Sequence, residues 1–264
     1  MRELIGKYGS VALLLVAAML ILPLEQKAEG YSAMLAGVAM LALAERRFAK
    51  HVFLLFVSLA ILGSTPIDTS IDLQHIVLMG VPLLLAIGVP YVVFRYIYQE
   101  PEIIQYHFSR HTFTRSQVGY IFLALVVSYL LLPFWMQSTG GYMNWSVATD
   151  PQSLFVLFLG TNGLGIWDEL FFIVTALGIL RHHFPFWQAN LVQAVLFTAF
   201  LYELGFQGWA PYAIFPFALS QGLVFKYTKN LVYIIAIHLT IDLVLYLALI
   251  NAHHPDLLPI FITR

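Results

Sequence analysis

The sequence contains no cysteine, and only 10% of its 264 residues are charged. The absence of cysteine excludes disulfide bonds, thiolate metal ligands and a cysteine nucleophile. A formal net charge of −1 leaves no basic excess, so nucleic acid is not an expected partner. Hydrophobic residues make up 60% of the chain and the mean hydropathy is +0.82, whereas soluble domains are about 25% charged and 45–50% apolar. We therefore expect an all-α integral membrane protein that has the lipid bilayer as its surroundings.

The N-terminal apolar run is not followed by a small-x-small cleavage site, so it predicts a retained first span rather than a signal peptide. A helix needs about 20 apolar residues to cross a bilayer. Nine stretches approach this length: 9–24, 31–45, 52–65, 76–98, 117–136, 153–181, 187–204, 210–226 and 230–250. The sequence thus predicts a polytopic bundle of eight or nine transmembrane helices.

Eleven of the thirteen Lys and Arg residues fall on one side of such a bundle if its N-terminus is cytoplasmic. These are Arg2, Lys7, Arg46, Arg47, Lys50, Arg95, Arg110, Arg115, Arg181, Lys226 and Lys229. The opposite side holds only Lys27 and Arg264. Because cytoplasmic loops carry the excess of basic residues, we expect the N-terminus inside and the C-terminus outside, in a bacterial or archaeal plasma membrane.

The stretch 99–116 is too polar to cross the bilayer, and its isoleucines and aromatic residues predict an interfacial helix. It separates two parts of one membrane-embedded unit. We expect residues 1–115 to form accessory transmembrane helices and residues 116–252 to form the functional core. Residues 253–264 would then be a short outer tail.

Ionisable residues within the spans are concentrated in the last four, which contain Asp168, Glu169, Glu203, His238 and Asp242. A carboxylate at the bilayer centre costs about 2.5–3.5 kcal/mol on insertion scales, so such residues mark functional sites. Helix rise places Glu169 roughly 18 Å and Asp242 roughly 20 Å from the basic ends of their spans. These two residues can therefore meet, together with His238, whereas Glu203 lies nearer the outer surface.

The spacing of the buried polar residues leaves more than one interpretation open. His238 and Asp242 are four positions apart and share a helix face, so the pair can orient the imidazole, ligate a metal or hold a water molecule. It can equally be an intrahelical hydrogen bond that neutralises two buried groups. The acidic pair can likewise be a structural contact between helices. Asn162, Gly163 and Gly165, just before it, can break the helix and admit water, whereas glycines in membrane helices also permit close helix packing.

The last four spans resemble the CPBP family of intramembrane proteases, also called the Abi or type II CAAX-prenyl endopeptidase family. The family pattern is EExxxR, then FxxxH on a following span, then HxxxN (or Asp) on the last span. Asp168 and Glu169 align with the first motif, and His238 and Asp242 align with the third. The resemblance covers about residues 150–250 and implies a CAAX-protease-like core in the C-terminal half.

Asp168 replaces the first glutamate of the family pattern, which is a mild change, and two further positions depart from the pattern more strongly. Ile173 stands where the first motif has arginine, and QAVLFTAF places Leu201 where the second motif has histidine. The resemblance implies that Glu169, beside Asp168, is the general base. It also implies that His238 and Asp242 stabilise the tetrahedral intermediate or, with Glu169, hold a metal such as zinc.

Three functions remain open at this point. The first is a membrane-embedded hydrolase that cleaves a peptide bond within or beside the bilayer. The second is a catalytically silent relative that binds a lipidated peptide, a lipid or a membrane-protein partner. The third is a proton-coupled transporter, because buried Asp, Glu and His also form proton relays, although no inverted repeat is visible.

Overall fold

The computed structural model describes residues 1–262 except 68, 71–72 and 109–111, so Arg110 and Arg264 lie outside the described residues. Its elements are α1 (Arg2–Ile21), α2 (Lys27–Leu41), α3 (Arg46–Gly63), α4 (Leu73–Val92), η1 (Val93–Ile97), α5 (Arg115–Thr139), η2 (Gly141–Asn144), α6 (Pro151–Asp168), η3 (Glu169–Ala176), α7 (Leu177–Leu180), α8 (Phe186–Glu203), α9 (Ala210–Thr228) and α10 (Leu231–His253). The described part of the chain is all-helical, which confirms the predicted fold class.

Each of the nine predicted spans coincides with a helical run. Within the described residues, five runs have the length and apolar composition needed to cross a membrane: α1, Gln74–Ile97, α5, Pro151–Leu180 and α10. The helices α2, α3, α8 and α9 are shorter or more polar. The protein is therefore a helical membrane protein.

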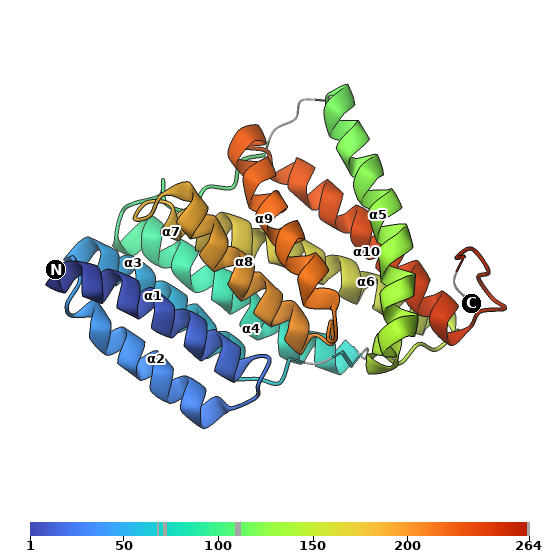
Figure 1. Cartoon of the computed structure of the whole chain (residues 1–264), viewed down its shortest axis with the longest axis horizontal. Helices are drawn as coiled ribbons and strands as arrows, with labels where there is room; N and C mark the ends of the chain where they lie inside the picture. The colour runs from blue at the N-terminus through green and yellow to red at the C-terminus, as the bar shows by residue number, and fades with distance from the viewer. Residues whose placement is uncertain (68, 71–72, 109–111, 263–264) are drawn as a thin grey trace.

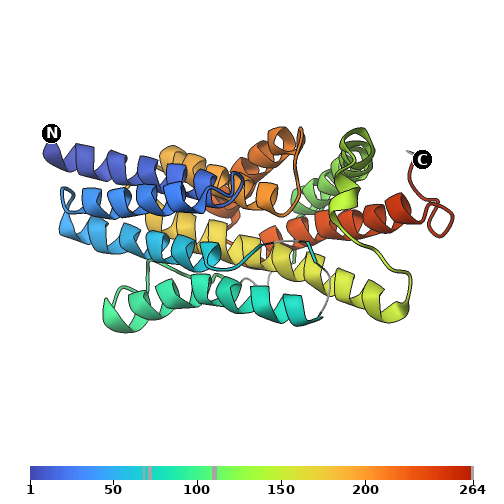
Figure 2. The same cartoon turned by 90° about the horizontal axis from the view of Figure 1, so that it is seen from below.

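The run Pro151–Leu180, which comprises α6, η3 and α7, forms the centre of the bundle. In this run, 78% of an 18-residue apolar stretch is buried inside the protein, whereas only 17% of the corresponding stretch of α5 is buried. Figures 1 and 2 show α1, α2 and α3 together near the N-terminus, and α5 beside α10 near the C-terminus. The central run thus connects the helices of the first half with those of the second.

Two side-chain hydrogen bonds fasten α4 to the helices beside it. Pro90 has no N–H to donate to the carbonyl oxygen of Ala86, one turn earlier in the helix. The hydroxyl of Ser58 in α3 donates to that oxygen instead, at 2.8 Å. The indole Nε1 of Trp167 in α6 donates to the carbonyl oxygen of Leu83, at 2.7 Å. The prolines of α4 therefore do not leave a buried carbonyl unpaired at Ala86.

The interfacial helix predicted for the stretch 99–116 is wrong over the described residues, which form turns and irregular chain before α5 begins. Ile103, one of the isoleucines on which the prediction rested, is buried in the core. Glu100 accepts a hydrogen bond from Lys50 of α3 at 2.5 Å. Tertiary contacts at both residues therefore hold the segment against the bundle and override its local helical preference.

Glu100 is the centre of a polar cluster that joins three segments at this end of the bundle. Its carboxylate also accepts hydrogen bonds from Arg47 and lies 3.2 Å from Nε2 of His51, whose Nδ1 is 2.9 Å from Nε2 of His183. Partial burial alone would raise the pKa of Glu100, but the hydrogen bonds from Lys50 and Arg47 outweigh it and lower the pKa to about 2. The cluster ties α3 to the loops that follow η1 and α7.

Candidate active site

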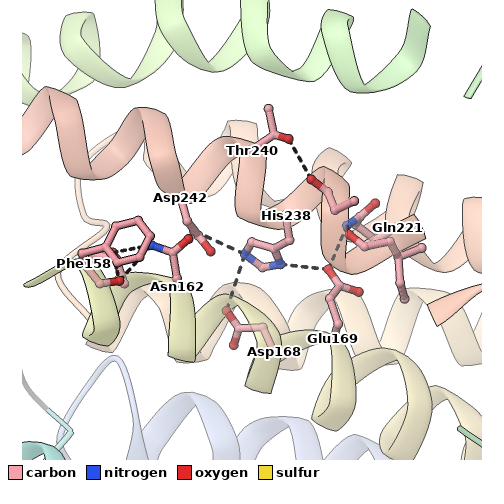
Figure 3. A network of polar contacts seen from close by, with 11 residues as sticks. Phe158, Asn162, Asp168, Glu169, Gln221, His238, Thr240 and Asp242 are labelled. Atoms are coloured by element: carbon pink, nitrogen blue, oxygen red, sulfur yellow. Dashed lines mark hydrogen bonds and ion pairs between the residues drawn. The ribbon is translucent and has the colours of Figure 1, made fainter. Parts of the chain in front are cut away.

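An acidic residue of the central run and an imidazole of α10 meet inside the bundle. The distance from Glu169 Oε1 to His238 Nδ1 is 2.8 Å. The other ring nitrogen, Nε2, lies 3.8 Å from Asp168 Oδ2 and 3.8 Å from Asp242 Oδ1 (Figure 3). All four side chains are at least 94% buried. The meeting that the helix depths predicted is confirmed.

Asp168 and Glu169 reach the same ring although they are neighbours in the chain. Adjacent side chains of an α-helix point about 100° apart. Both can approach the imidazole because they face different ring nitrogens, Asp168 facing Nε2 and Glu169 facing Nδ1. Asp168 ends α6, and Glu169 begins the π-helical segment η3. Short π-helical segments occur frequently at functional sites. The wider turn is supported by Thr175, whose hydroxyl donates to the Leu170 carbonyl oxygen five residues earlier, at 2.9 Å.

Gly165 permits the close approach of α6 and α10 at the site. A Cβ atom at this position would lie 1.8 Å from Asp242 Oδ2 and 3.1 Å from His238 Cδ2, so a side chain here would displace the Asp242 carboxylate or move the two helices apart. By contrast, a Cβ atom on Gly163 would have no heavy atom within 4 Å. Since α6 is continuous through both glycines, the structure favours close packing and contradicts a helix break before the acidic pair.

Gln221 of α9 is a site residue that the sequence analysis missed. Its fully buried amide Nε2 donates to Glu169 Oε1 at 2.8 Å and to the Ile234 carbonyl oxygen at 3.2 Å. The signal in the sequence was a glutamine in the middle of an apolar span, at the depth of the other polar residues. Polar side chains in membrane helices commonly bond to neighbouring helices.

Three carboxylate oxygens around His238 are buried and have no hydrogen-bond partner among the described residues. They are Asp168 Oδ1, Glu169 Oε2 and Asp242 Oδ2. Buried polar atoms in folded proteins are almost always hydrogen-bonded, so each of these atoms requires an explanation. The arrangement therefore has acceptors available for a water molecule or for the N–H groups of a ligand.

The site borders a cavity of about 440 Å³. Asp168, His238 and Asp242 line the cavity, and most of its remaining wall is apolar, with side chains from α5, α6, α9 and α10. Glu169 is completely buried and contacts the ring at the nitrogen opposite to the one flanked by the two aspartates. The cavity is thus an apolar chamber with an imidazole and two carboxyl groups on its wall.

Two walls of the cavity belong to α5 and α9, and α5 is bonded near each of its ends to α9 or to the N-cap residue of α9. The hydroxyl of Tyr120 donates to Ser220 Oγ at 3.1 Å. Toward the other end, Trp209 Nε1 donates to Ser138 Oγ at 3.0 Å. Between these bonds the two helices contribute apolar side chains to the cavity.

The two positions that depart from the family pattern have different surroundings. Leu201 borders the cavity, so an apolar side chain occupies the place where the family pattern has histidine. Ile173 is 1% exposed and belongs to the hydrophobic core. Phe197, which lies one helical turn before Leu201 and aligns with the phenylalanine of the second motif, is buried, and its ring centroid is 6.0 Å from that of His238. Glu203 is half-buried at the end of α8 and does not join the site.

The predicted zinc ligands Glu169, His238 and Asp242 do not fit a metal site in this arrangement. Glu169 and His238 are in direct hydrogen-bond contact at 2.8 Å, which leaves no room for an ion between them. No group of three potential ligands with suitable geometry occurs in the described part of the chain.

A family model described as "Type II CAAX prenyl endopeptidase Rce1-like" matches residues 150–244. These residues form an Rce1-like domain. The match begins at the N-cap of α6, ends two residues after Asp242, and includes Glu169, Gln221 and His238. No curated protein and no solved structure gives a significant match to the chain. The protein is therefore CAAX-protease-like over the helices that build the site, and the resemblance found in the sequence is confirmed.

Proposed function

We propose that the protein is a membrane-embedded endopeptidase that hydrolyses a peptide bond of a lipidated peptide in the cavity between α5 and α9. The observation that carries this proposal is the position of His238, whose Nε2 lies at the cavity wall between two carboxylates. The apolar lining suits a hydrocarbon group, and the polar wall suits the peptide attached to it. The Rce1-like family supports the same substrate class.

The geometry supports His238 as the general base. Nε2 would accept a proton from a water molecule as the water oxygen attacks the peptide carbonyl carbon. The resulting imidazolium would then donate that proton to the leaving amine nitrogen as the C–N bond breaks. Asp168 and Asp242 each lie 3.8 Å from Nε2, a distance that one hydrogen-bonded water molecule spans.

Glu169 has a supporting role in this proposal. Its carboxylate binds Nδ1, so it fixes the orientation of the ring and stabilises the imidazolium that forms, as the aspartate does in a serine-protease triad. The family resemblance implies instead that Glu169 itself is the base, and that stays a prediction. Its complete burial favours the role behind the imidazole.

The test is cleavage of a prenylated CAAX peptide by the purified protein in phosphatidylcholine vesicles. His238→Ala is expected to reduce the rate by about 10²- to 10⁴-fold, the usual contribution of a general acid–base residue. His253→Ala is the matched control, because His253 lies on the same helix and bonds to the Tyr142 carbonyl oxygen. Cleavage that is equal in the wild type and His238→Ala would refute the proposal.

A second candidate is a catalytically silent relative that binds the lipidated peptide without cleaving it. It is favoured by Leu201, which places an apolar side chain where the family pattern has the second histidine. Saturable binding of the same peptide, with no product formed by the wild type, would support this candidate instead.

A further inference from the structure

We infer that Gln221 is a positioning residue that, through Glu169, holds His238 in the tautomer with Nδ1 protonated and Nε2 directed to the cavity. This inference rests on the proposed function for its catalytic meaning. Its structural content concerns only the protonation and orientation of the imidazole.

One carboxylate oxygen of Glu169 contacts both Gln221 and His238. Glu169 Oε1 lies 2.8 Å from Gln221 Nε2 and 2.8 Å from His238 Nδ1, whereas Oε2 has no partner among the described residues. An amide N–H can only donate, so the shared oxygen acts as an acceptor toward Gln221. The same acceptor oxygen faces Nδ1, which favours the tautomer that carries its proton there.

Gln221 also forms a hydrogen bond to the backbone of α10. The same Nε2 donates to the carbonyl oxygen of Ile234 at 3.2 Å, and Ile234 lies one helical turn before His238. A carbonyl oxygen cannot donate, so the NH₂ group of Gln221 must face both acceptors. Gln221 therefore links the Glu169 carboxylate to the turn of α10 that carries the imidazole, and Figure 3 shows its contact with Glu169.

Burial makes these hydrogen bonds difficult to replace. Gln221, Glu169 and His238 are each at least 96% buried, so water cannot readily replace a lost hydrogen bond. Without the amide, Oε1 would lose a donor and the Glu169 side chain would lose a restraint on its rotation. The imidazole would then no longer be confined to one tautomer and one orientation.

Gln193 provides a matched control. It is also a fully buried glutamine, and its Nε2 donates to the Ala218 carbonyl oxygen of α9 at 2.9 Å and to Asn190 Oδ1 at 2.8 Å. Gln193→Met and Gln221→Met each remove an amide that joins helices and keep a side chain of similar length. Only Gln221→Met removes a bond to the site.

The experiment is ¹⁵N NMR of ring-labelled histidine in the full chain in micelles, with His238→Gln to assign the His238 signals. The wild type and Gln193→Met should show Nδ1 protonated and Nε2 unprotonated. Gln221→Met should show a mixture of tautomers. Gln221→Leu, which also removes the amide N–H donors, should change the signals in the same direction and is the alternative if the methionine variant does not fold. Unchanged His238 signals in the folded Gln221 variants would overturn the inference.

The cleavage assay adds a second readout. Gln221→Met should lower kcat by about 10- to 100-fold, as replacements of supporting residues around a site typically do, and should leave KM within about twofold. A tautomer change in a protein whose wild type cleaves no peptide would uphold the positioning role and reject the proposed function. Cleavage that depends on His238 and is unaffected in Gln221→Met would reject the positioning role alone.

Discussion

Replacing Gly165 by alanine tests the packing that builds the site. The added Cβ atom would lie 1.8 Å from Asp242 Oδ2, whereas real Cβ contacts are at least 3.0 Å long, so α6 and α10 must separate or the Asp242 side chain must turn away. Overpacking of this kind costs about 1–3 kcal/mol. Either response also moves Asp242 relative to His238 Nε2, so the variant should lose the geometry of the site as well as stability.

Gly163→Ala is the matched control for this substitution. It lies on the same helix, and its Cβ atom would have no heavy atom within 4 Å. Both variants gain the higher helix propensity of alanine, worth up to about 1 kcal/mol, so their difference isolates the steric effect. We expect the free energy of unfolding of Gly165→Ala, measured by denaturant titration in micelles, to be about 1–3 kcal/mol lower than that of Gly163→Ala.

A double-mutant cycle identifies Asp242 as the obstructing group. Asp242→Ala removes both carboxylate oxygens, so Gly165→Ala should cost less in that background than in the wild type. The coupling between contacting residues is typically about 0.5–3 kcal/mol. Equal stability of Gly165→Ala and Gly163→Ala, together with zero coupling to Asp242→Ala, would show that the described approach of the two helices does not exist in the protein.

Two further predictions concern the first half of the chain. Because the pKa of Glu100 is about 2 in the folded protein and 4.5 in its unperturbed state, the unfolded chain binds more protons in this range. The contribution of Glu100 is therefore fully present above pH 4.5 and is lost as the pH falls toward 2. Glu100→Gln should remove this part of the pH dependence of thermal unfolding, and an unchanged acid limb would contradict the ion pairs with Lys50 and Arg47. Ser58→Ala should lower the free energy of unfolding by about 1–3 kcal/mol, because it leaves the buried Ala86 carbonyl without its donor; a change below the error of the titration would contradict that bond.

The sequence was sufficient to predict where the helices lie, because long apolar runs separated by polar or turn-forming residues have few other solutions in a bilayer. The depth argument that brought Glu169 to His238 succeeded for the same reason, since helix rise is nearly constant. The sequence could not predict that the central run becomes π-helical at Glu169. That change depends on how α6 packs against its neighbours and leaves no periodic signal.

The failures have a common physical cause, which is that tertiary contacts decided the outcome. The interfacial helix predicted for 99–116 is replaced by turns because Glu100 and Ile103 find partners in the bundle. Gln221 was overlooked because a single glutamine in an apolar span can face lipid headgroups, another helix or a site. Only its two acceptors, the Glu169 carboxylate and the Ile234 carbonyl, distinguish these cases.

Leu201 connects the departures from the family pattern with the chemistry. With leucine at this position, His238 is the one imidazole among the described residues that line the cavity. We propose that the base in the cavity is this imidazole or one of the two aspartates, because Glu169 is completely buried and its Oε1 already faces two nitrogens. Leu201→His would place a second imidazole on the cavity wall. If His238 acts as the base, cleavage by Leu201→His should still depend on His238. Cleavage that became independent of His238 in this variant would assign the base function to the position that the family pattern reserves for histidine.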